Sequence, residues 1–298
     1  MKVIRPTVIV PEMLESSSVP EPDSAEAAWS SGTSYAEGAL AIRASTHRVY
    51  ERLIAGTSST PPESDATNWL DVGPTNRWAM FDQQASTATT EVGPLEVVIA
   101  PGAINSVAAL DVVGTDITVT VTDGAAGPVV YTQTISLDDA VITDWYQYVW
   151  EPFAQRTLAI FNDIPNYADS RVTVTLTGST ARCGTLVVGV PFDLGFVEGT
   201  PKIGIIDYSR KETDEFGTTT FVQRAYKKTL ECQMVMPRGQ FAAAYKVVSG
   251  LRATPCVWVS SEHPDLSPLI VYGFYTDFSI TVAYTAHVLC SLEIEGLI

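Results

Sequence analysis

Cysteine, histidine and positive charge are scarce in this sequence. Its 298 residues include four cysteines and three histidines, and 18 Lys and Arg side chains face 34 Asp and Glu, for a formal net charge of −16. The cysteines lie far apart without a C-x-x-C pair, so we expect buried thiols rather than a disulfide scaffold or a zinc site. Phosphate contacts require Lys and Arg, and we therefore expect no nucleic-acid partner.

Long apolar runs are missing as well. No stretch of 18 apolar residues is present, so no transmembrane helix is predicted. Residues 1–6 lack the apolar region and the small-residue cleavage site of a signal peptide. The negative charge also disfavours contact with anionic membranes. We expect synthesis in the cytoplasm and no membrane insertion.

Motifs of known catalytic chemistry are absent too. The sequence has no G-x-S-x-G, no H-E-x-x-H and no G-x-x-x-x-G-K-[ST]. We expect His47 and His263 at the surface and His287 packed in a strand. Carboxylates are too numerous to separate a catalytic pair or a Ca²⁺ site from an acidic surface. We therefore predict no catalytic residue, no cofactor and no metal ligand, with a glycan hydrolase as the least favoured alternative.

What the sequence does contain is mainly β-strand patterning. Residues 117–122 and 172–177 alternate apolar and polar side chains, which indicates antiparallel strands with one buried face. Asp123-Gly124 follows the first run as a turn signal. Short strands separated by such turns predict a jelly-roll-like β-sandwich over residues 76–195.

Residues 196–298 have a different pattern, typical of an α+β sheet or split barrel with one helix. Residues 218–236 suggest a long strand or hairpin. Helical spacing of Phe241, Tyr245, Val248 and Leu251 predicts a helix over residues 240–252. Four strands are expected after it, at 256–259, 269–272, 278–284 and 287–294.

The first 75 residues divide into two parts. Residues 1–28 hold a serine run, prolines and glutamates, which predicts an extended, solvated arm able to lie along a neighbouring subunit, with one short strand at 8–10. Residues 29–75 predict a small module with a hairpin of strands at 39–42 and 47–50. Two Trp and two Tyr are expected to supply most of its core.

Two segments carry candidate binding residues. Aromatic rings beside carboxylates suit sugar binding, because sugar C–H faces stack on rings while carboxylates accept hydroxyl hydrogen bonds. Residues 138–150 supply both, although the same rings also fit the core or edge of a sandwich. The candidate glycan-binding residues are Trp145, Tyr146, Tyr148 and Trp150.

The second segment is polar and dense in charge. Residues 207–217 form either a plain turn leading into a strand at 218–221 or an interaction loop. The candidate interaction residues are Asp207, Arg210, Asp214 and Phe216.

One resemblance concerns the small module. Trp29, the Tyr-x-x-Gly turn that starts at Tyr35, Tyr50 in the hairpin, Pro61 and Trp69 follow in the order seen in chitin- and cellulose-binding modules of carbohydrate-binding family 5/12. The four aromatic residues match framework positions of that family. The resemblance implies a small carbohydrate-binding-like fold for residues 29–75.

A second resemblance covers nearly the whole chain. The run WLDVGPTNRWAMFD at residues 69–82, the start at residues 1–21, and segments 252–255, 257–259 and 272–274 resemble tail proteins of long-tailed bacteriophages. The resemblance implies a galactose-binding-like sandwich at 76–195 and a tube-like, ring-forming domain at 196–298. It also implies a virion component of the tail tip or baseplate without enzymatic activity.

The expected partners follow from this resemblance. They are the tail tube, hub and fibre proteins, together with copies of the chain itself in a three- or six-fold ring whose sheet edges meet at each joint. The tail-protein hypothesis also includes accessory contact with cell-surface glycan. The alternative is a receptor- or carbohydrate-binding tail adhesin.

Overall fold

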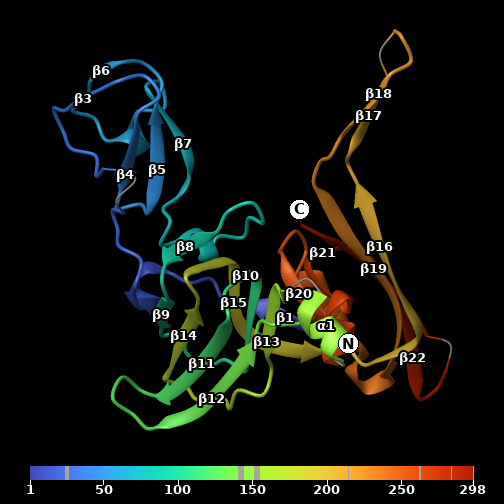
Figure 1. The fold of residues 1–298 in the computed structure, drawn as a ribbon. Helices are drawn as coiled ribbons and strands as arrows, with labels where there is room; N and C mark the ends of the chain where they lie inside the picture. Colours follow the sequence, from blue (N-terminus) through green and yellow to red (C-terminus); the bar gives the residue numbers. More distant parts are fainter. Residues whose placement is uncertain are drawn as a thin grey trace.

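The computed structural model describes residues 1–23, 27–139, 144–150, 155–213, 215–261, 263–282 and 284–297 (Figure 1). The chain is mainly β, with 53% strand and 11% helix, as the sequence predicts. A ten-stranded sheet and a five-stranded sheet form the body, and three small sheets lie outside it. The described residues include five 3-10 turns between strands: η1 (Pro11–Met13), η2 (Pro62–Ser64), η3 (Ala79–Phe81), η4 (Arg238–Gln240) and η5 (Pro264–Leu269).

The large sheet runs through the whole molecule, and its strand pairs are antiparallel. Its order is β13 (Leu158–Phe161), β10 (Ser106–Val113), β15 (Thr180–Asp193), β1 (Lys2–Pro6), β20 (Cys256–Val259), β21 (Ile270–Thr281), β22 (His287–Gly296), β19 (Tyr226–Pro237) and β16 (Phe196–Asp207). β8 (Thr89–Val92) pairs with β15 outside this path.

The five-stranded sheet packs on the first part of the large sheet and completes a β-sandwich (Figure 1). Its order is β12 (Val129–Ser136), β11 (Asp116–Asp123), β14 (Ser170–Thr177), β9 (Leu95–Ile99) and β2 (Leu14–Ser17). Buried and partly exposed side chains alternate along β11 and β14, which confirms the period of two. Val119 and Val174 point into the core, where they share one apolar cluster with Val107 and Val188 of the large sheet.

The first six residues differ from the expected solvated arm. β1 lies between β15 and β20 in the middle of the large sheet, and Val3 and Ile4 are fully buried on its two faces. The amino group of Met1 donates a hydrogen bond to the carbonyl of Gly195 at 2.6 Å. The strand is at 2–6 rather than 8–10. Only two apolar residues mark it locally, and its partners lie far away in the sequence.

The second part of the large sheet carries the helix α2 (Phe241–Gly250), which confirms the helix predicted at 240–252. Ala244 and Val248 of α2 pack in one cluster with Trp258 and Met234 of the sheet. In the part of the chain after α2 that the structure describes, three strands follow rather than the four expected. β21 continues through the expected break because an irregularity between Tyr275 and Asp277 preserves its pairing with β22.

The small module is built from short strands. β4 (Leu40–Arg43), β5 (Arg48–Arg52) and β7 (Trp69–Pro74) form one sheet, and β3 (Ser34–Tyr35) pairs with β6 (Gly56–Thr57). The β4–β5 pair confirms the predicted hairpin. Ala41, Tyr50 and Trp69 are buried, with Trp29 and Tyr35 against them.

A buried carboxylate attaches this module to the sandwich. Glu21 is only 4% exposed at its side chain, where it accepts a hydrogen bond from Thr75 at 2.7 Å and pairs with Nδ1 of His47 at 2.9 Å. The His47 ring packs on Trp78 with 4.4 Å between ring centroids. His47 is therefore partly buried, not at the surface as expected, because it is packed between segments before and after the module.

The role of β1 can be tested by substitution. Ile4→Ala should lower the free energy of unfolding by about 2–5 kcal/mol, because it removes a fully buried side chain from the centre of the sheet. Val8→Ala, at a side chain that is 66% exposed, is the matched control and should change it by less than about 0.5 kcal/mol. Urea unfolding followed by tryptophan fluorescence measures both. Equal, small effects would restore the solvated-arm interpretation.

Candidate interaction surfaces

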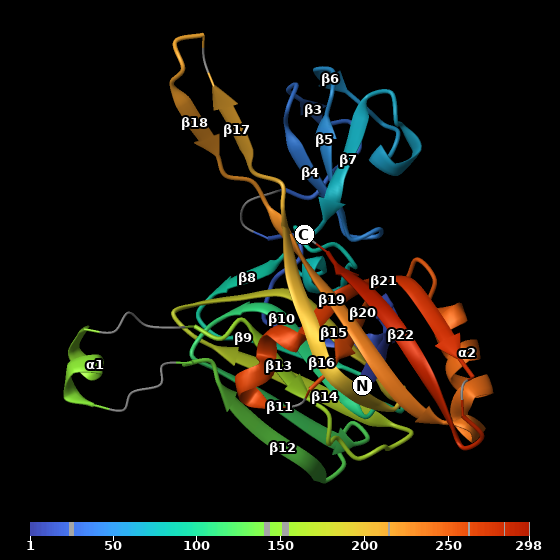
Figure 2. The ribbon, with the colours of Figure 1, turned by 90° about the vertical axis from the view of Figure 1, so that its right-hand side faces the viewer.

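A long β-hairpin projects from the body of the molecule. β16 and β19 form its base, and beyond them β17 (Arg210–Thr213) pairs with β18 (Thr219–Val222) (Figures 1 and 2). All eight residues of β17 and β18 are exposed, and within the described residues these two strands pair only with each other. The strand expected at 218–221 is present, as one side of this hairpin.

The hairpin separates the residues predicted to form an interaction loop. Asp207 ends β16, and its carboxylate accepts a hydrogen bond from the backbone N–H of Ser209 at 2.8 Å. The hydroxyl of Ser209 and, to a smaller extent, this N–H hold the pKa of Asp207 below its usual value. Arg210 begins β17 and pairs with Glu212 at 3.3 Å. Phe216 lies at the tip and is 92% exposed. Asp214 lies outside the described residues.

Apolar side chains continue from this tip down to the sheet. β16 is the last strand of the large sheet, and among the described strands it pairs only with β19, so its other edge is open over twelve residues. Exposed apolar edges of this length are sites of strand association. The exposed apolar residues of the hairpin and edge are Phe196, Ile203, Ile205, Ile206, Tyr208, Phe216, Phe221, Val222 and Tyr226.

An ion pair holds the base of the hairpin. Lys227 of β19 pairs with Glu295 of β22, and its ammonium lies 5.4 Å from the ring centroid of Tyr208. The hydrogen bond to Glu295 raises the pKa of Lys227 above its usual value. Because these groups belong to the sheet and to both sides of the hairpin, the contact fixes the direction in which the hairpin projects.

This contact predicts a measurable change in local opening. Glu295→Gln should accelerate hydrogen exchange of the amides from Tyr226 to Leu230 several-fold, because the ammonium loses its charged partner. Glu231→Gln is the control. Its carboxylate, on β19 like Lys227, pairs with Lys202 of β16, but the Glu231 and Lys202 side chains are 51% and 73% exposed. Exchange that is equal in the two variants would contradict a fixed hairpin base.

The predicted glycan platform is a short exposed helix, α1 (Trp145–Trp150). Its apolar side chains are not part of a core, since Trp145 is 83%, Tyr146 74% and Trp150 71% exposed. Tyr148 belongs to the same helix, but its side chain lies outside the described residues. Asp139, which precedes α1 in the sequence, pairs with Arg156 at 2.7 Å. The core interpretation of these aromatics is therefore wrong, and a surface platform is available.

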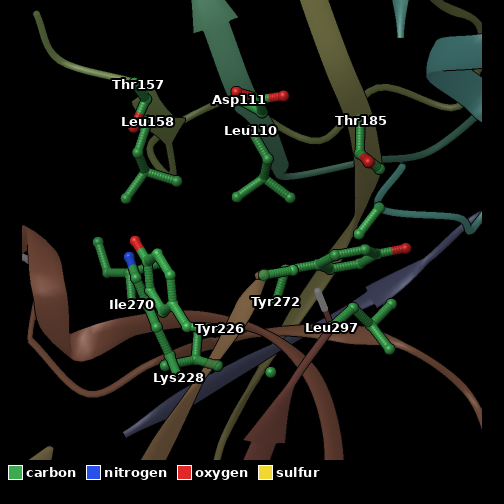
Figure 3. Close-up of a pocket in the computed structure, with 14 residues that line it drawn as sticks. Leu110, Asp111, Thr157, Leu158, Thr185, Tyr226, Lys228, Ile270, Tyr272 and Leu297 are labelled. Atoms are coloured by element: carbon green, nitrogen blue, oxygen red, sulfur yellow. The ribbon is translucent and has the colours of Figure 1, made fainter. Parts of the chain in front are cut away.

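A groove that sequence reasoning missed lies between the two parts of the large sheet (Figure 3). Its cavity of about 400 Å³ has one wall from the sandwich, with Leu110 and Leu158, and a facing wall with Ile270 and Tyr272. Burial raises the pKa of Tyr272 to about 12, with smaller contributions from Cys256 and Asp82. Two further cavities of about 350 and 320 Å³ also share Ile270. No local pattern marks this groove, because its walls come from distant segments.

Reactive groups are sparse among the described residues. The four cysteines are buried, as predicted, and burial raises the pKa of each thiol, for Cys183 to about 12. His263 is at the surface as expected, whereas His287, expected to be packed, is exposed at the start of β22. In the described part of the chain, no group of three or more His, Cys, Asp or Glu side chains is placed to hold a metal ion.

Comparisons with known proteins do not assign the chain to a family. No family model and no curated protein matches the chain. Among the described helices, none has the length and apolar character needed to span a membrane.

Proposed function

We propose that this chain is a non-enzymatic structural component of a bacteriophage tail tip or baseplate, where copies of it assemble into a ring. The observation that carries the proposal is the open, apolar edge of β16, where Phe196 is 78% and Ile205 67% exposed. Soluble proteins normally blunt such an edge with charge, proline or a covering segment. In β16 such features are Glu198, Pro201 and Lys202, with an irregularity in the pairing between Glu198 and Lys202, all within the first seven residues of the strand. The stretch Ile203–Ile206 beyond them is open and apolar, and it is suited to a permanent joint.

Ring geometry follows from the asymmetry of the molecule. The open edge lies at one end of the large sheet, and the sandwich lies at the other (Figure 1). A joint between two different surfaces is heterologous, and such joints close into rings when the rotation permits. The resemblance of residues 69–82 to phage tail proteins supports a three- or six-fold ring in the virion, in contact with tube, hub and fibre proteins.

Self-assembly is the first test. The purified full chain should form a closed ring, seen by light scattering coupled to size exclusion and by negative-stain electron microscopy. Ile205→Lys should reduce the ring to monomers, because a charge on an edge strand opposes strand association. Val92→Lys, at a sandwich residue that is 86% exposed, should leave it intact. A wild-type chain that is monomeric at every concentration would refute the proposal.

Location in the virion is checked separately. Antibodies against the chain should label the tip end of the tail on particles from the cells that produce it. A label elsewhere on the particle, or no label on intact particles, would contradict a tail-tip role.

The alternative function is a tail adhesin that binds cell-surface glycan, and α1 favours it. Trp145 and Trp150 are exposed rings on one short helix, and such rings stack on sugar faces. Replacing both with Ala should weaken binding on a glycan array by about tenfold or more, near 1.4 kcal/mol. The fold should be spared, because a loss of roughly 3–5 kcal/mol of stability is expected only for buried rings. Val92→Ala is the binding control, and unchanged binding in the double variant would refute the alternative.

A further inference from the structure

We propose that the hairpin tip of one copy docks in the groove between the two parts of the large sheet of a second copy. This inference rests on the proposed self-assembly and names one of its contacts. The hairpin supplies the first argument. An isolated two-stranded hairpin is marginally stable in water, yet β17 and β18 stand alone with all eight residues exposed. Packing on another surface would stabilise them.

The groove supplies a matching surface. Ligand and peptide sites are concave and mostly apolar, with a few polar groups that fix orientation, and a cavity of about 400 Å³ lies in their usual size range. Leu110 and Leu158 face Ile270 and Tyr272 across the cavity, with Leu297 at the same wall as Tyr272 (Figure 3). The walls are therefore suited to aromatic side chains inserted from outside.

The tip has the side chains that this groove requires. Phe216 is 92% and Phe221 75% exposed, and Phe221 lies directly opposite Lys211 in the hairpin register. The tip therefore presents the ring of Phe216 with the anion Glu215 beside it, while the second ring lies with the cation Lys211 further down the hairpin, below the Thr213–Thr219 pair.

The rim of the groove carries charges of both signs. Asp111 lines it with a carboxylate that is 47% exposed and pairs with Arg182 at 2.7 Å. Lys228 lines the opposite wall (Figure 3). Glu215 at the tip has the sign opposite to Lys228, and Lys211 further down the hairpin has the sign opposite to Asp111, so the two surfaces can pair in apolar character and in charge.

The hairpin tip that occupies the groove must belong to another copy of the chain. Tyr226 and Lys228 at the start of β19 line the groove, so the hairpin is rooted in one of its walls. From there the tip projects away from the body in both views (Figures 1 and 2). A chain therefore cannot place its own tip in its own groove without unfolding β19. Tip and groove are different surfaces, so the contact is head-to-tail, as a ring requires.

Disulfide trapping tests this contact directly. One full-length chain carries Phe216→Cys and a second, of different tagged mass, carries Leu158→Cys. The natural cysteines are buried and do not compete. Mild oxidation of the mixture should give a heterodimer that reductant separates. Phe216→Cys mixed with Val92→Cys, at an exposed site on the sandwich, is the control and should give none.

A second variant separates this proposal from the ring itself. Phe216→Ser combined with Phe221→Ser should weaken self-association by at least tenfold in sedimentation equilibrium, with unchanged thermal unfolding of the body. If that variant assembles like the wild type while Ile205→Lys does not, the docking proposal fails and the ring proposal stands. If trapping occurs equally with Val92→Cys, or not with Leu158→Cys, the groove is not the docking site. A monomeric wild type refutes both proposals.

Discussion

The insertion of β1 between β15 and β20 is the interaction on which the rest of the structure depends. Lys2–Pro6 pair on one side with β15 of the sandwich, and the first three of these residues pair on the other side with β20 of the C-terminal part. Val3 and Ile4 point to opposite faces and enter different apolar clusters, so the same strand contributes to two cores. Without it, the strands of the sandwich and those of the helix-covered sheet would not form one continuous sheet in the described chain, and side-chain packing such as that of Ala108 and Val187 against Val257 would be left to hold them together.

The placement of both candidate surfaces follows from this single sheet. One wall of the groove comes from β10 and β13 of the sandwich, and the facing wall comes from β21 and β19. Between the two parts lies the small apolar cluster of Ile4, Ala108 and Val257. The same strand order leaves β16 as the last strand and β19 as its only neighbour in the described chain. The Lys227–Glu295 pair then directs the hairpin away from the groove. Edge, hairpin and groove are thus consequences of one topology.

Sequence patterns predicted those strands and helices that the spacing of apolar residues within one segment determines. The alternation at 117–122 and 172–177 predicts β11 and β14 correctly because one face of each strand is buried and the other is partly exposed to solvent. Helical spacing marks α2 for the same reason. β1 was missed, because two apolar residues do not reveal partners almost 190 positions and more than 250 positions away. Apolar character alone also does not tell burial from exposure. Ile205 and Trp145 have the side chains of core residues but lie at the surface, and the groove exists only after distant strands meet.

Net charge limits the kind of contact that can hold copies together. Each copy carries a formal charge of −16, so Coulomb repulsion opposes assembly, although salt screens it beyond about 8 Å at physiological ionic strength. Burial of apolar surface contributes about 25 cal/mol per Å² and does not depend on the sign of charge. Apolar side chains are exposed along β16 and at Phe216 and Phe221. Three basic side chains of residues 207–226 nearly balance four acidic ones, so this hairpin has a formal charge of only 3 − 4 = −1 in an acidic chain. The hairpin therefore combines the apolar surface that drives association with a nearly neutral charge, which adds little to the repulsion between copies.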